Sequence, residues 1–120
     1  MTGKIRLAIP TTGEGGLRAV VSNVFARAQT FTYVDIVDGE IRDIRVEVNK
    51  ASGLKHGTGP IVAKTLKDNG VDIVVASDVG PGARTLLDMN GIMVVYAKPR
   101  IKVSEAVEKA LEDLRNLRAR

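Results

Sequence analysis

Two glycine-proline steps, Gly59-Pro60 and Gly80-Pro81, constrain the fold of this chain more than any other feature of its sequence. Each precedes a helical pattern, and proline suits the start of a helix because its missing N–H would have no partner there. Each predicted helix leads into a short apolar segment, 71–76 and then 92–96, which is typical of a strand buried on both faces. Ser104 then caps a last helix. Successive strand–helix–strand units need right-handed crossovers in one parallel sheet, so the second half of the chain predicts an α/β fold.

The first half of the chain predicts a β-hairpin. Two strand-like segments, 31–37 and 41–48, flank the dipeptide Asp38-Gly39. A type I′ turn needs positive φ at both central residues, and this dipeptide favours it. The second segment alternates apolar and charged residues, so we expect one apolar and one charged face.

The remaining segments complete a single domain over residues 1–120, since chains of about this length usually form one core. Residues 4–9 alternate in hydrophobicity and predict a strand that ends at Pro10. Residues 11–29 predict an irregular segment with one helical turn near Ser22. The expected fold is a five-stranded mixed sheet, in which the hairpin supplies one antiparallel strand, with about three helices packed on it.

The chain has no cysteine and a single histidine, His56. Disulfides, thiolate ligation of zinc or of an iron–sulfur cluster, and cysteine nucleophiles are therefore excluded. One imidazole cannot complete a tetrahedral zinc site, although it could supply one contact to a metal cluster, especially in a symmetric dimer. Tryptophan is absent and aromatic residues make up 3%, which leaves little for a nucleic-acid surface built on stacked bases.

The apolar runs are far shorter than the roughly 20 residues that a membrane-spanning helix needs. The first residues lead directly into a strand-like segment, without the apolar block of a signal peptide. We therefore expect a cytoplasmic protein with no membrane partner.

The net charge is +4, and much of the basic excess lies between Lys98 and Arg120. This pattern favours an ordinary solvated surface with a basic tail, and the alternative is attraction of an anionic ligand or of nucleic acid. The lack of cysteine and the many charged residues are compatible with a thermophilic source.

Three polar or glycine-bearing segments, 11–29, 49–58 and 77–80, follow strands that end at the same edge of the predicted sheet. Both proline-started helices begin at that edge. Open α/β sheets bind ligands at the carboxyl ends of their strands, and helix N-termini suit anions. We therefore predict a cradle for an anionic ligand. The residues predicted to form it are Arg27, His56, Gly57, Thr58, Gly59, Gly80, Gly82 and Arg84.

Within this cradle, His56 is the residue predicted to contact a metal. The alternative for His56 is an exposed loop residue without a ligand. The alternative for both glycine-proline steps is a plain strand-to-helix turn, in which these residue types are common.

Asp35, Asp72 and Asp78 are the carboxylates nearest to the predicted strands. A two-metal nuclease needs several carboxylates on one edge of its sheet. We expect these three not to converge, and we predict no catalytic residue.

Several segments of the chain match a known family when they are taken in order. They are the opening strand 4–10, the stretch VSNVFARA at 21–28, the Asp38-Gly39 turn, and the segments 70–76, 79–83 and Gly91-Ile92. Together they cover almost the whole chain and resemble the dinitrogenase iron–molybdenum cofactor biosynthesis domain family. The resemblance implies a ribonuclease-H-like three-layer fold with a five-stranded mixed sheet. Nitrogenase members of that family carry or store an anionic iron–sulfur precursor or the finished cofactor, and many archaeal members have no established role.

Two departures from the family pattern fall in one stretch. The family commonly has Ser-x-His-Phe-Gly-Arg-Ala after its first strand. Here Val24 stands in place of the histidine and Ala26 in place of the glycine, whereas Arg27 and Ala28 are kept. Valine cannot ligate a metal, so this chain cannot hold a cluster through that position.

The sequence therefore predicts a small non-enzymatic binding or carrier protein. By resemblance, its ligand is an anionic iron–sulfur or iron–molybdenum cofactor precursor, or a related small anion, bound at the glycine-rich sheet edge without cysteine ligands. The same resemblance implies a protein partner in cluster transfer. Two alternatives stay open: a ribonuclease-H-like nuclease, and a nucleic-acid or protein interaction module that uses the basic C-terminal region.

Overall fold

The computed structural model describes residues 3–118. The strands are β1 (Lys4–Thr12), β2 (Val20–Val21), β3 (Thr30–Val37), β4 (Glu40–Val48), β5 (Ile73–Ala76) and β6 (Met93–Tyr96), and the helices are α1 (Thr58–Asp68), α2 (Pro81–Met89) and α3 (Val103–Arg118). The strand order is β4-β3-β1-β5-β6, and β2 pairs with β1. β1, β5 and β6 are parallel, whereas β3 runs antiparallel to both β1 and β4. The predicted α/β fold with a mixed sheet and three helices is confirmed for the described residues.

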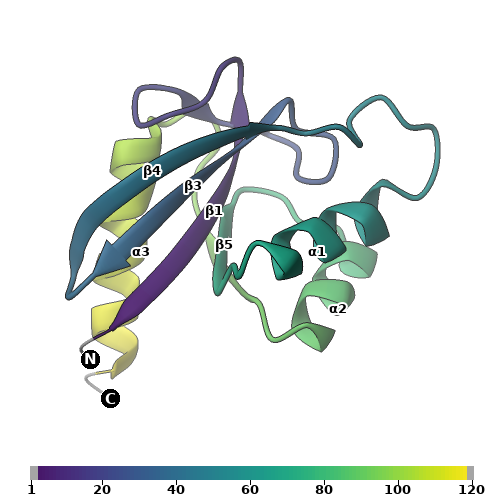
Figure 1. The fold of residues 1–120 in the computed structure, drawn as a ribbon. Coiled ribbons are helices and arrows are strands. Elements are labelled where there is room, and N and C mark those ends of the chain that lie inside the picture. Colours follow the sequence, from purple (N-terminus) through teal and green to yellow (C-terminus); the bar gives the residue numbers. More distant parts are fainter. Residues whose placement is uncertain (1–2, 119–120) are drawn as a thin grey trace.

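The sheet lies between two layers of helices, with α1 and α2 on one face and α3 on the other (Figure 1). On the first face, the rings of Phe25 and Phe31 meet edge to face, with their centroids 5.7 Å apart. On the second face, α3 covers alternate residues of the same strands. The buried residues of that second core include Leu7, Ile9, Val34, Ile36, Val75, Val103 and Val107. Each face of the sheet therefore has its own apolar core.

The sheet has six strands, and the prediction of five was wrong. β1 does not end at Pro10 but continues to Thr12, where it pairs antiparallel with β2. Proline lacks an N–H, yet the Pro10 carbonyl still accepts a hydrogen bond from the Ser22 N–H at 2.8 Å. This pairing replaces the helical turn that we expected near Ser22.

The predicted hairpin is confirmed. Asp38 and Gly39 have φ values of 53° and 86°, as a turn with two left-handed central residues requires. Next to the turn, Ile36 pairs with Ile41 and Asp35 pairs with Asp43. One residue of β4, Arg42, is therefore extra, and it forms a bulge at the hairpin end of the strand.

Two details of the C-terminal part differ from the prediction. β6 is an edge strand with Met93 and Tyr96 well exposed, rather than a strand buried on both faces, because no further strand follows it within the described residues. Ser104 lies inside the first turn of α3 and does not cap it, since the helix already begins at Val103.

Candidate functional site

A hollow of about 360 Å³ opens at the edge of the sheet where α1 and α2 begin. Three separate parts of the chain line it: the segment after β2, the first residues of α1, and the residues around the start of α2. The lining residues are Val24, Phe25, Ala26, Arg27, Thr58, Gly59, Asp78, Gly80 and Ala83. The structure thus brings four of the residues predicted from the sequence to one place: Arg27, Thr58, Gly59 and Gly80.

The starts of α1 and α2 give this hollow its electrostatic character. Within residues 3–118, neither helix has a side-chain cap. Gly57, which precedes α1, has a φ of 76°, a left-handed conformation that favours glycine. Uncapped N–H groups and the helix dipole place partial positive charge at a helix start. Together with the hydroxyl of Thr58, they supply hydrogen-bond donors to a ligand in the hollow.

Arg27 lines the hollow, but its guanidinium is already engaged. Its Nη2 donates to the carbonyl oxygen of Lys55 at 3.0 Å, and its Nη1 donates to the carbonyl oxygens of Leu54 and, at 3.5 Å, Ser52. Arg27 therefore ties the loop before α1 to the segment after β2. Its side chain holds a wall of the hollow, and because its partners are neutral carbonyls its positive charge still acts on a ligand there.

Two further polar side chains hold the walls of the hollow, and the sequence did not predict them. The Nδ2 of buried Asn49 donates to the carbonyl oxygens of Ala26 and Ala28, at 2.9 and 2.8 Å. The Oγ of Ser77 donates to the carbonyl oxygen of Ser22 at 3.0 Å. An asparagine directly after a strand was the available signal, since a polar side chain that becomes buried needs partners.

The other predicted residues lie outside the lining of the hollow. His56 is exposed in the loop before α1, and Gly57 precedes the lining residue Thr58. Gly82 is exposed, and Arg84 lines a separate groove of about 760 Å³ between α2 and β6. Across the described range 3–118, no three side chains of His, Cys, Asp or Glu are grouped so that they could hold a metal ion.

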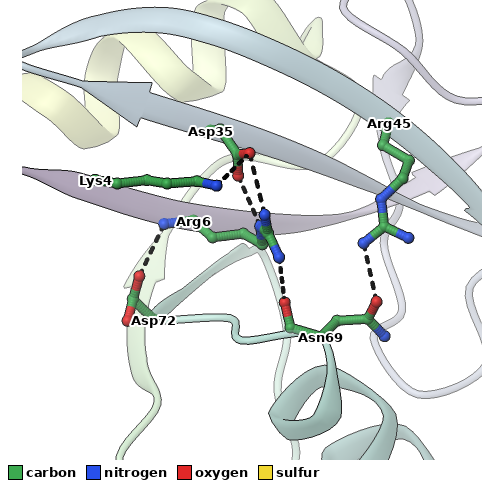
Figure 2. A network of polar contacts seen from close by, with 6 residues as sticks. All are labelled: Lys4, Arg6, Asp35, Arg45, Asn69 and Asp72. Carbon is green, nitrogen blue, oxygen red and sulfur yellow. Dashed lines mark hydrogen bonds and ion pairs between the residues drawn. The ribbon is translucent and has the colours of Figure 1, made fainter.

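The three carboxylates singled out in the sequence fall at two places. Asp78 lines the hollow. Asp35 and Asp72 lie at the other end of the strands, where β1 and β5 begin, and both contact Arg6 (Figure 2). The Arg6 Nε donates to Asp35 Oδ1 at 2.7 Å, and the backbone N–H of Arg6 donates to Asp72 Oδ2 at 2.8 Å. Two of the three carboxylates therefore share one partner, which the sequence did not predict, and Asp78 lies apart from them.

Arg6 changes the protonation of its buried partner. Its hydrogen bond and positive charge, together with the Lys4 ammonium 3.3 Å away, hold the pKa of Asp35 below its usual value. The same guanidinium donates to the carbonyl oxygen of Asn69 at the end of α1. This group of side chains joins β1, β3 and α1, and its position indicates a structural role.

The glycine-rich segment after β1 lies on the α3 face and does not line the hollow. Beneath it, the buried hydroxyls of three threonines form a cluster, in which Thr11 Oγ1 lies 2.6 Å from Thr30 Oγ1 and 3.1 Å from Thr32 Oγ1. The Gly16 N–H donates to Thr32 Oγ1 at 2.9 Å, and Thr30 Oγ1 donates to the Gly13 carbonyl at 3.0 Å. These contacts anchor the segment to the sheet.

The chain matches one protein family along most of its length. Residues 4–113 match the family model described as dinitrogenase iron-molybdenum cofactor. The match spans nearly the whole chain, so the protein belongs to this family, as the sequence resemblance predicts. Among the described residues, no helix has the length and apolar character needed to cross a membrane.

Three individual proteins are similar to this chain over most of its length. An uncharacterized protein of Methanocaldococcus jannaschii is 30% identical over 88 residues, which are 73% of this chain and 74% of the relative. The apo form of the orange protein from Desulfovibrio gigas is 26% identical with a TM-score of 0.81, covering 94% of this chain and 92% of that one. A protein of Thermotoga described as a candidate NifB protein is 35% identical with a TM-score of 0.73, covering 90% of this chain and 88% of that one.

Proposed function

We propose that this protein is a non-enzymatic carrier that binds an anionic iron–sulfur or iron–molybdenum cofactor precursor in the hollow between the starts of α1 and α2. The observation that carries the proposal is the meeting of two uncapped helix starts with Thr58, Gly59 and Gly80 around one open space, in a chain of this family. Glycine at two lining positions lets a ligand approach the backbone closely.

The chemistry of the hollow limits the form of the cargo. The chain has no cysteine, and the lining offers one hydroxyl, one carboxylate, the guanidinium of Arg27 and backbone N–H groups. A cluster that needs protein thiolates would not be held here. The cargo must therefore bring its own complete set of inorganic ligands, and the protein would hold it by hydrogen bonds and by the field of the two helices.

The first experiment asks whether the hollow is the binding site. The protein is purified without oxygen, loaded with a preformed anionic metal–sulfur cluster, and examined by native mass spectrometry and by the charge-transfer absorption of the cluster. Gly80→Leu should abolish retention, because the new side chain occupies the hollow without backbone strain: Gly80 has a φ of −59° and free space around it.

Gly53→Leu is the matched control. Gly53 also has free space around it, and it does not line the hollow. Retention should therefore be unchanged in this variant. Failure of the unaltered protein to retain any cluster, or equal retention in Gly80→Leu, would contradict the proposal.

Asp78 gives a second test that depends on the sign of the ligand charge. Asp78 lines the same hollow, where its negative charge would repel an anion, so Asp78→Asn should tighten binding of an anionic cluster severalfold. If the true ligand were a divalent cation, the same change would weaken binding. A metal-dependent nuclease activity that disappears in Asp78→Asn would favour the ribonuclease-H-like enzyme instead.

Four further points belong to this proposal. A protein partner in cluster transfer follows from the carrier role. The ribonuclease-H-like label is compatible with a sheet ordered β4-β3-β1-β5-β6 in which β3 is antiparallel, and it stays a prediction. A cytoplasmic location also stays a prediction. Within the described residues, no observation specifically favours nucleic-acid binding by the basic C-terminal region. Arg120 lies outside those residues.

A further inference from the structure

β4 is one edge of the sheet, and within residues 3–118 its outer side has no strand beside it. Its large apolar side chains are unusually open to solvent: Ile44 is 37% exposed, Val46 40% and Val48 67%. They pair with Val34, Thr32 and Thr30 of β3, so they lie on the face of the sheet that α3 covers further along. α3 does not extend over them. Gly15 approaches Val46 from the segment between β1 and β2, but all three side chains of this apolar row stay more than a third exposed.

The opposite face of β4 carries charges of alternating sign. Asp43, Arg45 and Glu47 follow one another at every second position. Arg45 is held in place, since its guanidinium lies 4.6 Å from the centre of the Tyr33 ring and donates to Asn69 Oδ1 at 2.9 Å. Arg45 is thus ordered before any partner arrives.

Natural edge strands are commonly protected from pairing by bulges and charges. The bulge of β4 lies at Arg42, near the hairpin turn, and leaves residues 43–48 in regular register. The regular part has free backbone groups on its outer side and both rows of side chains described above. This segment is suited to receive another strand.

We propose that β4 pairs antiparallel with β4 of a second copy of this chain, with the twofold axis at Val46. In this register Val46 lies opposite the partner's Val46, and Ile44 lies opposite the partner's Val48. On the other face, Arg45 lies opposite the partner's Glu47. Within residues 44–48 every apolar side chain meets an apolar one and Arg45 meets its opposite charge, while Asp43 falls opposite the uncharged Asn49 of the second copy.

Neighbouring registers lack this agreement. An axis at Arg45 places two arginines against each other and Asp43 against the partner's Glu47. An axis at Ile44 pairs Arg45 with the partner's Asp43, but it sets Val46 against the partner's Arg42. The self-complementary pattern identifies a second copy, rather than an unrelated strand, as the occupant of this edge.

The pairing would join the two sheets into one, with both α3 helices on the same face. Because the two β4 strands run in opposite directions, the two hollows would lie at opposite ends of the joined sheet. The dimer is therefore independent of the proposed function, and each can fail without the other.

The first test measures the subunit number of the full chain by light scattering after gel filtration and by sedimentation over a range of concentrations. The expected result is a dimer that dissociates on dilution. Val46→Lys sets two ammonium groups against each other at the axis and should weaken dimerisation by about tenfold or more, since each 1.4 kcal/mol is a factor of ten. Met89→Lys, at a side chain 76% exposed on α2, is the control and should leave the dimer intact. A monomer at every concentration, or a dimer unaffected by Val46→Lys, would overturn the proposal.

The second test fixes the register. Arg45→Glu alone and Glu47→Arg alone each place like charges opposite one another and should weaken the dimer. The double variant Arg45→Glu/Glu47→Arg restores opposite charges across the axis at Val46, so dimerisation should recover. In the register centred on Ile44, position 45 faces the partner's Asp43, so the double variant would set two carboxylates against each other and recovery would fail. Circular dichroism of each variant establishes that it is folded, and a folded double variant that does not recover contradicts the proposed register.

Discussion

Arg6 organises the edge of the sheet at which β1 and β5 begin. Its side chain is 25% exposed and that of its partner Asp35 is 10% exposed, so this ion pair is far less solvated than the surface pairs of the helices. A charge that is partly buried loses hydration, and it stays favourable only while its partner is present. Removing one member of the pair should therefore matter more than removing a member of a surface pair.

Asp35→Asn should lower the free energy of unfolding by about 1–3 kcal/mol, because the guanidinium of Arg6 loses its charged acceptor. Urea denaturation measures this directly. The control is Asp68→Asn, which breaks the exposed pair with Lys64 on α1 and should cost less than about 0.5 kcal/mol. Equal effects of the two substitutions would show that the Arg6 pair behaves as an ordinary surface contact.

The same pair predicts a dependence of stability on pH. The pKa of Asp35 is lowered in the folded protein, so the carboxylate binds its proton less readily there than in the unfolded chain. The stabilisation is fully present above the unfolded pKa of about 4 and is lost as the pH falls through the lower folded pKa. A series of urea unfolding curves at decreasing pH should show this loss of stability. In Asp35→Asn, the contribution of Asp35 to the pH dependence should be absent.

Among the connecting segments, the one between β1 and β2 depends most on glycine. Gly15 has a φ of 82°, and a Cβ placed on it would lie 2.6 Å from Val46 Cγ1 and 2.9 Å from Thr32 Oγ1. Both the backbone conformation and the close approach to β4 therefore require glycine here. Gly13 has nearly the same φ, 79°, but has open space around it.

This pair of glycines allows conformation and close contact to be separated. Gly13→Ala should cost about 1 kcal/mol, from the left-handed backbone alone. Gly15→Ala should cost about 1–3 kcal/mol more, because the segment must also move away from β4. Thermal unfolding of the two variants measures the difference, and similar losses in both would mean that the contact with Val46 yields easily.

At the scale of the whole molecule, the sequence was sufficient for most of the architecture. Hydrophobic periodicity and the glycine-proline steps predict the hairpin, the alternation of strands and helices, and the edge where their ends meet. β2 was missed because two residues carry no periodic signal, and their pairing depends on β1 continuing past Pro10.

The candidate site was predictable only in outline. Topology places Thr58, Gly59 and Gly80 at one edge, since the ends of parallel strands and the starts of the following helices coincide there. Whether a side chain faces the hollow depends on tertiary contacts that sequence alone does not contain. Arg27 is engaged with loop carbonyls, and Arg84 lies in another groove, for this reason.

The hollow is assembled from segments that are far apart in the chain, so the unfolded protein cannot form it. A cargo that binds only the folded protein must therefore raise the free energy of unfolding of the protein. At a free concentration one hundred times the dissociation constant, the gain is about 2.7 kcal/mol, which corresponds to a rise in Tm of roughly 10 °C for a chain of this size. Differential scanning calorimetry with the preformed cluster should show this rise in Tm. The Tm of Gly80→Leu should not rise when the cluster is added. An unchanged Tm in the loaded unaltered protein would contradict binding in the hollow.

The engagement of Arg27 has a kinetic consequence. Because its guanidinium fastens the loop before α1 to the segment after β2, the mouth of the hollow is already shaped in the empty protein. A binding site whose walls are already formed does not have to close around its ligand after binding. Uptake would then proceed in one step, at a speed proportional to the amount of cargo offered and without a plateau.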